Sequence, residues 1–300
     1  MTSAPASLPG ATEVPRKLPP LVCGVDDGFI QPLCVMMESL AAAHPGGTGD
    51  MRLIVLNHAL SKSSSDAIRW HADRLSLSVE LRTAPAPSSR YPAFRWTSDA
   101  TYMRLAIPEI ITDHRKVLYL DVDLLILKDL RPLLEHDLSG AALAAVRDPK
   151  VPLLKIGKVL PGWERLGLSG NQEYFNNGVM LLDLPECRRQ QIFARASDFL
   201  IEHPENVRYW DQDAMNWSAA DNWLRLDRKW NTFALSPRIQ LGNFIHQAES
   251  VIPLAQLLAD EDTAAVLHFA GANKPWAAGF PDGPLRDLYA KFLGAVVGQQ

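Results

Sequence analysis

Cysteine is scarce in this sequence. Cys23, Cys34 and Cys187 are the only three among 300 residues, too few and too widely spaced for a disulfide framework or a cysteine-rich zinc site. An excess of one charge is also lacking. The 30 Lys and Arg face 34 Asp and Glu, which argues against a protein that binds nucleic acid through a basic surface. We therefore expect buried, free thiols in a reducing compartment and no nucleic-acid partner.

Long apolar runs are absent as well. The best candidate, residues 117–127, is broken by Asp121 and Asp123, whereas a membrane helix needs about 18 uninterrupted apolar residues. The first twenty residues carry five prolines, and their basic pair comes too late for the basic region of a signal peptide. These patterns predict a flexible proline-rich leader over residues 1–20, no transmembrane segment and a cytoplasmic location.

What is present is the composition and punctuation of an α/β protein. Apolar residues make up 47% of the chain and charged residues 21%, ordinary values for a globular domain. Short apolar runs alternate with stretches of helical character, which favours a mixed, mainly parallel sheet flanked by helices. We expect one domain over residues 21–276, with residues 277–300 forming a C-terminal helix that packs on it in preference to lying on a membrane. The expected strands are 21–25, 52–56, 77–81, 117–120, 141–146 and 179–182, and the expected helices are 32–43, 61–75, 185–203 and 284–297.

The most informative motif is a pair of aspartates directly after an apolar run. Side chains alternate in extended backbone, so Asp121 and Asp123 point to the same side, about 7 Å apart, while Val122 points into the fold. Two carboxylates so close repel each other, and a divalent cation between them removes the repulsion. Hard oxygen ligands suit Mg²⁺ or Mn²⁺. Asp-x-Asp also begins at residues 211 and 260, and we interpret the latter as a solvated polar turn.

A histidine near the C-terminal end of the sequence strengthens the interpretation of that motif as a metal site. His268 follows the apolar run 264–267, and a neutral imidazole at a strand end can complete a metal site. Gly271 permits close backbone approach, and Lys274 supplies a point charge for a phosphate. Each also has a structural interpretation, as a hydrogen-bonded core histidine or a surface lysine. Together with the acidic pair, they predict a site for a metal ion and a diphosphate.

Further motifs occur in a recognisable order: VCGVDD at 22–27, TYMRL at 101–105, LYLDVD at 118–123, YFNNGVMLL at 174–182, WDQD at 210–213 and HFAGANKPW at 268–276. With them, the sequence resembles the retaining glycosyltransferases of family 8 over about residues 21–276. That family includes bacterial lipooligosaccharide galactosyltransferases, glucosyltransferases and glycogenin. The resemblance implies a single domain with the GT-A-type fold of nucleotide-diphospho-sugar transferases.

The resemblance also implies an activity and the residues that carry it. It implies a retaining hexosyltransferase that moves galactose or glucose from a UDP-sugar to a hydroxyl of a glycan or a lipid-linked saccharide, with Mn²⁺, or alternatively Mg²⁺, as the metal. By position in the motifs, the metal ligands are Asp121, Asp123 and His268. The contacts to the nucleotide sugar are Gly24, Asp26, Asp27, Arg104, Val122, Asn177, Gly271 and Lys274, and the catalytic residues around the donor sugar are Asn176, Asp211 and Gln212.

Two positions depart from the family pattern. A separate pair, Asp211 and Gln212, bears on the reaction mechanism. Gly28 stands where the family often has asparagine, and Asn177 replaces a commoner small residue beside the sugar pocket. Asp211 is the carboxylate nearest the anomeric carbon by position, but the family places Gln212 there, and an amide is a feeble nucleophile. We therefore favour front-face transfer, with the metal and Lys274 stabilising the departing diphosphate and a phosphate oxygen taking the acceptor proton.

Two other classes stay open at this point. Haloacid-dehalogenase-like phosphatases also place Asp-x-Asp after an apolar strand, but small polar residues follow there, where this chain has Leu124 and Leu125. A non-catalytic nucleotide-sugar-binding protein of the same fold would keep the metal residues without turnover. A dinucleotide dehydrogenase is disfavoured because no Gly-x-Gly-x-x-Gly follows the first expected strand. The sequence leaves open the acceptor, the hexose and the oligomeric state.

Overall fold

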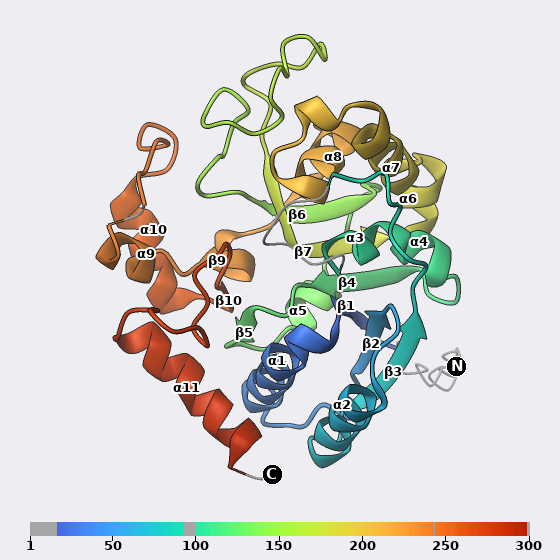
Figure 1. Ribbon diagram of the computed structural model, residues 1–300, viewed down its shortest axis with the longest axis vertical. Coiled ribbons are helices and arrows are strands. Elements are labelled where there is room, and N and C mark those ends of the chain that lie inside the picture. The colour runs from blue at the N-terminus through green and yellow to red at the C-terminus, as the bar shows by residue number, and fades with distance from the viewer. Residues whose placement is uncertain (1–16, 93–99, 243, 299–300) are drawn as a thin grey trace, which may run out of the picture.

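Two sheets form the framework of the protein (Figure 1), whose computed structural model describes residues 17–92, 100–242 and 244–298. The larger sheet has the strand order β3-β2-β1-β4-β7-β6-β8, and the smaller has the order β5-β10-β9. In the larger sheet only β7 runs antiparallel to its neighbours, so the predicted mixed, mainly parallel sheet is confirmed. The strands are β1 (Leu21–Val25), β2 (Arg52–Asn57), β3 (Ser78–Thr83), β4 (Lys116–Leu120), β5 (Leu124–Ile126), β6 (Leu143–Arg147), β7 (Phe175–Asp183), β8 (Leu224–Arg225), β9 (Thr232–Phe233) and β10 (Val266–His268).

Helices cover both faces of the larger sheet (Figure 1). Alternation along β4 shows why: Tyr119 packs in the cluster that includes α7 and α8, whereas Leu118 packs in the cluster that includes α1 and α2. The helices are α1 (Ile30–Ala43), α2 (Lys62–Arg74), α3 (Ala100–Met103), α4 (Ile107–Ile110), α5 (Arg131–Leu134), α6 (Leu184–Arg189), α7 (Ile192–Glu202), α8 (Trp210–Ala219), α9 (Ser236–Gln240), α10 (Leu254–Thr263) and α11 (Pro284–Val297), with single 3₁₀ turns η1 (Asp27–Phe29), η2 (Arg104–Ala106), η3 (Pro204–Asn206) and η4 (Arg228–Asn231).

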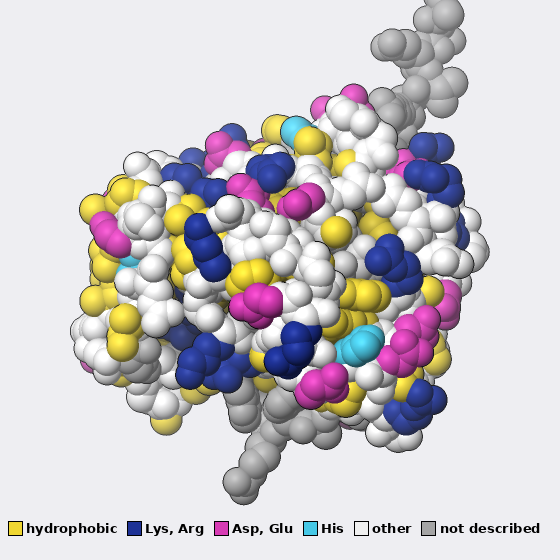
Figure 2. Space-filling model, turned by 90° about the horizontal axis from the view of Figure 1, so that it is seen from above, with side chains coloured by type: hydrophobic (Ala, Val, Ile, Leu, Met, Phe, Trp, Pro, Cys, Tyr) yellow, Lys and Arg dark blue, Asp and Glu magenta, His cyan; other side chains and the backbone are white. Residues whose placement is uncertain are grey.

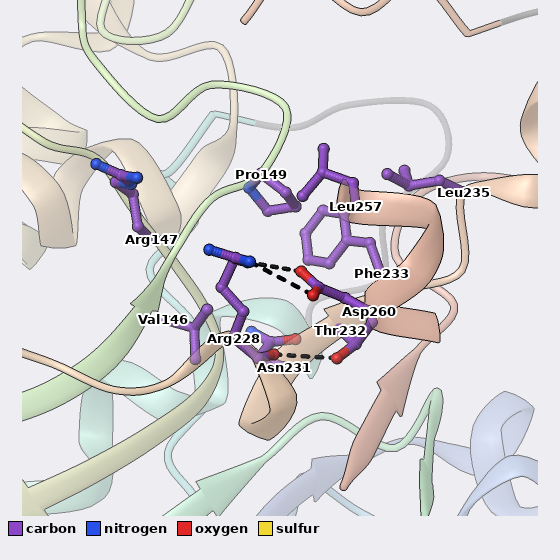
Figure 3. Close-up of a pocket in the computed structure, with 10 residues that line it drawn as sticks. All are labelled: Val146, Arg147, Pro149, Arg228, Asn231, Thr232, Phe233, Leu235, Leu257 and Asp260. Atoms are coloured by element: carbon purple, nitrogen blue, oxygen red, sulfur yellow. Dashed lines mark hydrogen bonds and ion pairs between the residues drawn. The ribbon is translucent and has the colours of Figure 1, made fainter. Parts of the chain in front are cut away.

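Three local expectations were wrong. The predicted helix over 185–203 is two helices, α6 and α7, because Gln191 between them has the left-handed conformation, with φ of 55°. The predicted strand over 179–182 begins four residues earlier as β7. The predicted polar turn at Asp260 is the last part of α10, where Arg228 Nε lies 2.6 Å from Asp260 Oδ2 and ties η4 to that helix (Figure 3).

The C-terminal helix α11 lies at the edge of the fold (Figure 1). The helix α11 has the predicted bounds and packs against α1, with Tyr289 and Phe292 buried. Cys23, Cys34 and Cys187 are buried and unpaired, as predicted. Residues 1–16 of the predicted leader lie outside the described residues, and the division of the chain into leader, domain and terminal helix stays a prediction. Among the helices that the structure describes, none has the length and apolarity to cross a bilayer.

The surface agrees with the balanced charge of the sequence. On the face shown in Figure 2, Lys and Arg side chains are scattered among Asp and Glu side chains. That face therefore carries both signs of charge side by side, which is the distribution typical of a globular domain surface.

The connection between the two sheets places the candidate site. Asp121, Val122 and Asp123 link β4 of the large sheet to β5 of the small one. The backbone N–H of Asp121 donates to Gly178 O of β7 at 2.8 Å, and Phe269 N after β10 donates to Asp123 O at 3.0 Å. The strand β10 pairs antiparallel with β5 and places His268 opposite Leu124. The acidic link 121–123 therefore lies between β4 and β5 and beside β7 and β10.

Candidate active site

The structure brings the three predicted metal ligands together. One ligand atom from each of Asp121, Asp123 and His268 lies within 4.8 Å of the others. His268 Nε2 is 3.3 Å from Asp123 Oδ1 and 3.9 Å from Asp121 Oδ2. Two carboxylate oxygens and one imidazole nitrogen at this spacing fit a hard divalent cation such as Mn²⁺ or Mg²⁺.

A chain of amides orients the imidazole toward the aspartates. Asn231 Nδ2 donates to Asn176 Oδ1 at 2.8 Å, so Asn231 Oδ1 is free to accept from His268 Nδ1, also at 2.8 Å. The proton on the imidazole is thereby assigned to Nδ1, which leaves the Nε2 lone pair directed at the acidic pair. His268 is only 2% exposed, and its ring cannot turn away without breaking this chain.

Lys274 adjoins the same cluster. Its ammonium group donates to Asp123 Oδ2, and it also donates to Phe269 O at 2.9 Å. Burial alone would raise the pKa of Asp123, but the positive charge of Lys274 and its hydrogen bond outweigh it and hold that pKa well below its usual range. Asp123 is therefore ionised and ready to bind a cation.

Arg104 joins the other aspartate to the helix α8. Its Nη2 donates to Asp121 Oδ1 at 2.8 Å, and its Nε lies 3.0 Å from Asp211 Oδ2. Its Nη1 donates to Asn177 O at 2.8 Å, and the guanidinium lies over the Tyr119 ring. Burial would lower the pKa of Arg104, but the charges of Asp121 and Asp211 raise it further, so this 5% exposed side chain stays a cation.

The predicted catalytic residues form a connected polar wall. Asn176 Nδ2 donates to Gln212 Oε1 at 2.8 Å, and Gln212 Nε2 donates to Asp148 Oδ2 at 3.2 Å. Asn177 Nδ2 donates to Asp211 Oδ2. Burial, helped by the nearby charge of Asp121 and opposed by that of Arg104, raises the pKa of Asp211 to about 6. Asp211 and Gln212 lie in the first turn of α8.

Asp213 holds that turn in place. Its carboxylate is fully buried and accepts from Leu160 N, Arg208 N, Tyr209 N and the Tyr174 hydroxyl, at 2.7 to 3.1 Å. Because Asp213→Ala removes the shared acceptor of these four donors, we expect it to lower the free energy of unfolding by about 3 kcal/mol or more, measured by urea denaturation. The control Asp198→Ala, on the exposed side of α7, should stay within about 0.5 kcal/mol of the wild type. Equal effects of the two substitutions would contradict this role.

These groups line an open cleft of about 580 Å³. Besides the metal cluster, the predicted residues on its wall are Gly24, Arg104, Val122, Asn176, Asn177, Asp211, Gln212, Gly271 and Lys274. Cleft residues that the sequence analysis did not single out include Tyr119, Asp148, Lys150, Tyr209, Phe233 and Arg238.

Two predicted nucleotide contacts are not brought to this wall. Asp26 Oδ1 accepts from Gly28 N at 2.9 Å and caps η1. Asp27 accepts from the backbone N–H and the hydroxyl of Ser61, at 3.1 and 3.0 Å, at the start of α2. Each carboxylate therefore serves a local turn or helix end, and contact of these two residues with a nucleotide stays a prediction.

The sequence analysis did not single out Asp148 or Asn231, and only the first of them carries a sequence signal. Asp148 follows β6 just as Asp121 follows β4, so the rule of polar residues at strand ends could have found it. Asn231 lies in the short turn η4 with no motif around it. Asn231 and Phe233 also line a small pocket beside the Arg228–Asp260 ion pair (Figure 3). Asn231, which holds the His268 imidazole, is in the same short turn η4 as Arg228, and the ion pair joins that turn to α10.

Comparison with known proteins agrees with this architecture. The family model of glycosyl transferase family 8 matches residues 20–279. The chain is 29% identical over 199 residues to General stress protein A of Bacillus subtilis and 31% identical over 186 residues to a lipopolysaccharide 1,2-glucosyltransferase of Escherichia coli. These matches cover 65% and 62% of this chain but only 64% and 51% of the two relatives. The crystal structure of the galactosyltransferase LgtC with donor and acceptor sugar analogs superposes with a TM-score of 0.74 at 26% identity, covering 92% of this chain and 96% of LgtC.

The fold thus matches the GT-A-like architecture of glycosyltransferases, and Asp121, Asp123 and His268 form a candidate metal site in its cleft. The chain belongs to glycosyl transferase family 8. The same match, which spans most of the chain, gives no support to the phosphatase alternative.

Proposed function

We propose that this protein is a retaining, Mn²⁺-dependent hexosyltransferase that moves glucose or galactose from a UDP-sugar to a hydroxyl of a glycan or lipid-linked saccharide. The observation that carries the proposal is the convergence of Asp121, Asp123 and His268 in the cleft of a family 8 chain. A cytoplasmic site of action fits the three unpaired thiols.

The residues around the cluster suit departure of a diphosphate. Asp121, Asp123 and His268 would hold the metal, which when bound supplies Lewis-acid stabilisation of the leaving group. Lys274, already at Asp123, places a second positive charge beside it. When a diphosphate binds here, the ammonium group of Lys274 would move from the Asp123 carboxylate to a phosphate oxygen, which is also negatively charged.

The part of the cleft predicted to hold the donor sugar, around Asp211 and Gln212, favours front-face transfer. Asp211 is engaged by Arg104 and Asn177, and Gln212 is held between Asn176 and Asp148. A carboxylate bound on both sides by donors is a weakened nucleophile, and it is better suited to holding sugar hydroxyls. The acceptor proton would then pass to the departing phosphate oxygen.

The test is ligand-dependent thermal stability. We expect UDP with Mn²⁺ to raise the melting temperature by several degrees, because ligand that binds only the native state stabilises it. The conservative variant Asp123→Asn should lose the Mn²⁺-dependent part of that shift, whereas Asp198→Asn, on the exposed side of α7, should keep it. The absence of a shift with any nucleoside diphosphate would contradict the proposal.

Turnover separates the enzyme from a binding protein of the same fold. We expect Mn²⁺-dependent release of UDP from UDP-glucose or UDP-galactose in the absence of acceptor, and comparison of the two donors identifies the hexose. Binding of UDP and Mn²⁺ without release from any UDP-sugar would favour the non-catalytic alternative.

A further inference from the structure

The cleft contains a second pair of cations that the transfer chemistry described above does not use. Lys150, just after β6, and Arg238, in α9, both line its wall. Arg104 and Lys274 are each paired with aspartates. In contrast, neither Lys150 nor Arg238 forms an ion pair with a carboxylate within the part of the chain that the structure describes.

Both side chains are partly removed from water, and the charge of Asp148 offsets only part of the effect of burial on their pKa values. Burial and the nearby charge of Arg238 lower the pKa of Lys150, and burial lowers the pKa of Arg238. Arg238 Nε is buried and has no hydrogen-bond partner among the described residues. Like charges placed close together with an unused buried donor are unfavourable in the free protein, and a bound anion would remove both costs.

The carboxylate nearest to them is already occupied. Asp148 Oδ1 accepts from Lys150 N at 2.9 Å and from Val151 N at 3.1 Å, and Asp148 Oδ2 accepts from Gln212 Nε2. Asp148 therefore holds the turn after β6 and the sugar-side amide, and it lies within range to influence both cations without bonding to either side chain.

Lys150 lies toward the sugar-side amide, because Asp148, whose carboxylate accepts from Lys150 N, also accepts from Gln212 Nε2. The pKa of each cation responds to Asp148, whereas Lys274 is bound to Asp123 of the metal cluster. The guanidinium of Arg238 lies beside Gly271, with Nη1 3.5 Å from the point where a Cβ would stand. Gly271 has φ of +94°, a backbone conformation that favours glycine, and both Gly271 and Arg238 line the cleft.

We propose that Lys150 and Arg238 bind an anionic group, a phosphate or a carboxylate, carried by the acceptor saccharide. The inference rests on the proposed function, since the metal and Lys274 serve the diphosphate of the donor. A guanidinium offers paired donors to such a group, and the ammonium of Lys150 adds a point charge. The pair would then select charged acceptors over neutral ones.

The experiment is calorimetric titration of protein saturated with UDP and Mn²⁺, so that the donor end is filled. The probes are glucose 6-phosphate, glucuronate and glucose. We expect at least one charged sugar to bind about tenfold or more tightly than glucose, and the two charged probes distinguish phosphate from carboxylate. Arg238→Gln and Lys150→Met should each remove most of that preference, while Arg238→Lys should keep part of it. The control Arg189→Gln removes an exposed surface cation of α6 and should keep all of it.

Each other outcome has a defined meaning. Equal binding of glucose and both charged sugars, or a preference unchanged in Arg238→Gln and Lys150→Met, overturns the inference and leaves the proposed function standing. Loss of UDP binding in those variants, with their melting temperatures unchanged, overturns it by assigning the pair to the donor. Failure of the wild type to bind UDP with Mn²⁺ overturns the proposed function and the inference with it.

Discussion

Replacement of Gly178 by alanine is expected to weaken metal binding strongly while the protein still folds. A Cβ at this position of β7 would stand 2.5 Å from His268 Cε1 and 2.9 Å from Asp121 Oδ2 and Asn176 Oδ1. Real Cβ atoms essentially never approach so closely, so the imidazole or the acidic link must move. The imidazole is buried and anchored by Asn231, so it has little freedom to yield. We expect the affinity for Mn²⁺ to fall by about 100-fold or more, as for loss of the groups that orient metal ligands.

The measurement is titration of Mn²⁺ into protein with UDP present, compared with urea denaturation of the same variant. Gly294→Ala is the matched control, because a Cβ there meets nothing within 4 Å and the residue lies in α11. That control should bind Mn²⁺ normally and gain up to about 1 kcal/mol of stability from helix propensity. Normal Mn²⁺ binding by Gly178→Ala would mean that β7 and His268 do not meet as the structure places them.

Much of the framework was predictable because the signal is local. The parallel strands β1, β2 and β4 each contain a short apolar run, and the first of these runs matches β1 residue for residue. The two aspartates after β4 were found by the same reasoning, since alternation puts them on one side of a strand end. His268 was combined with the aspartates because an imidazole at a strand end can complete a metal site, and the resemblance to a family then implied all three as ligands, although 144 residues separate His268 from Leu124, its neighbour across the small sheet. No local pattern encodes that register.

The errors have physical causes in particular residues. Asn176, Asn177 and Gly178 conceal the start of β7, because polar residues and glycine are rare in buried strands unless they serve a site. The left-handed Gln191 ends a helix without glycine or proline. At β7 the contacts of Asn176 and Asn177 with α8 outweigh the local pattern.

Arg104→Met is the second substitution with a large expected effect. It removes the cation between Asp121 and Asp211 and leaves Asn177 O without its donor. Loss of one partner from a buried charge pair leaves the other uncompensated, so we expect the metal-free protein to lose about 3–5 kcal/mol of unfolding free energy at pH 8. Mn²⁺ binding should weaken as well, because Arg104 orients the Asp121 carboxylate.

The dependence on pH distinguishes this cause from a simple packing defect. The pKa of Asp211 is raised to about 6 even with Arg104 present, and it rises further in the variant because Arg104 lowers it. A folded pKa above the unfolded value means that the native state binds more protons, so its stability falls as pH rises through that interval. The deficit of Arg104→Met should therefore be smaller at pH 5 than at pH 8 by urea denaturation.

Arg82→Met is the matched control for that experiment. Arg82 also bridges two carboxylates, those of Glu80 and Asp113, but both lie near the surface. Hydrogen bonding to Arg82 holds the pKa of Asp113 below its usual range, so Asp113 stays ionised throughout the interval from pH 5 to pH 8. The control should lose about 1 kcal/mol or less, equally at both pH values, since solvent screens an exposed pair. An Arg104→Met deficit that does not change with pH would show that the lost guanidinium acts through packing over Tyr119 and not through the charge of Asp211.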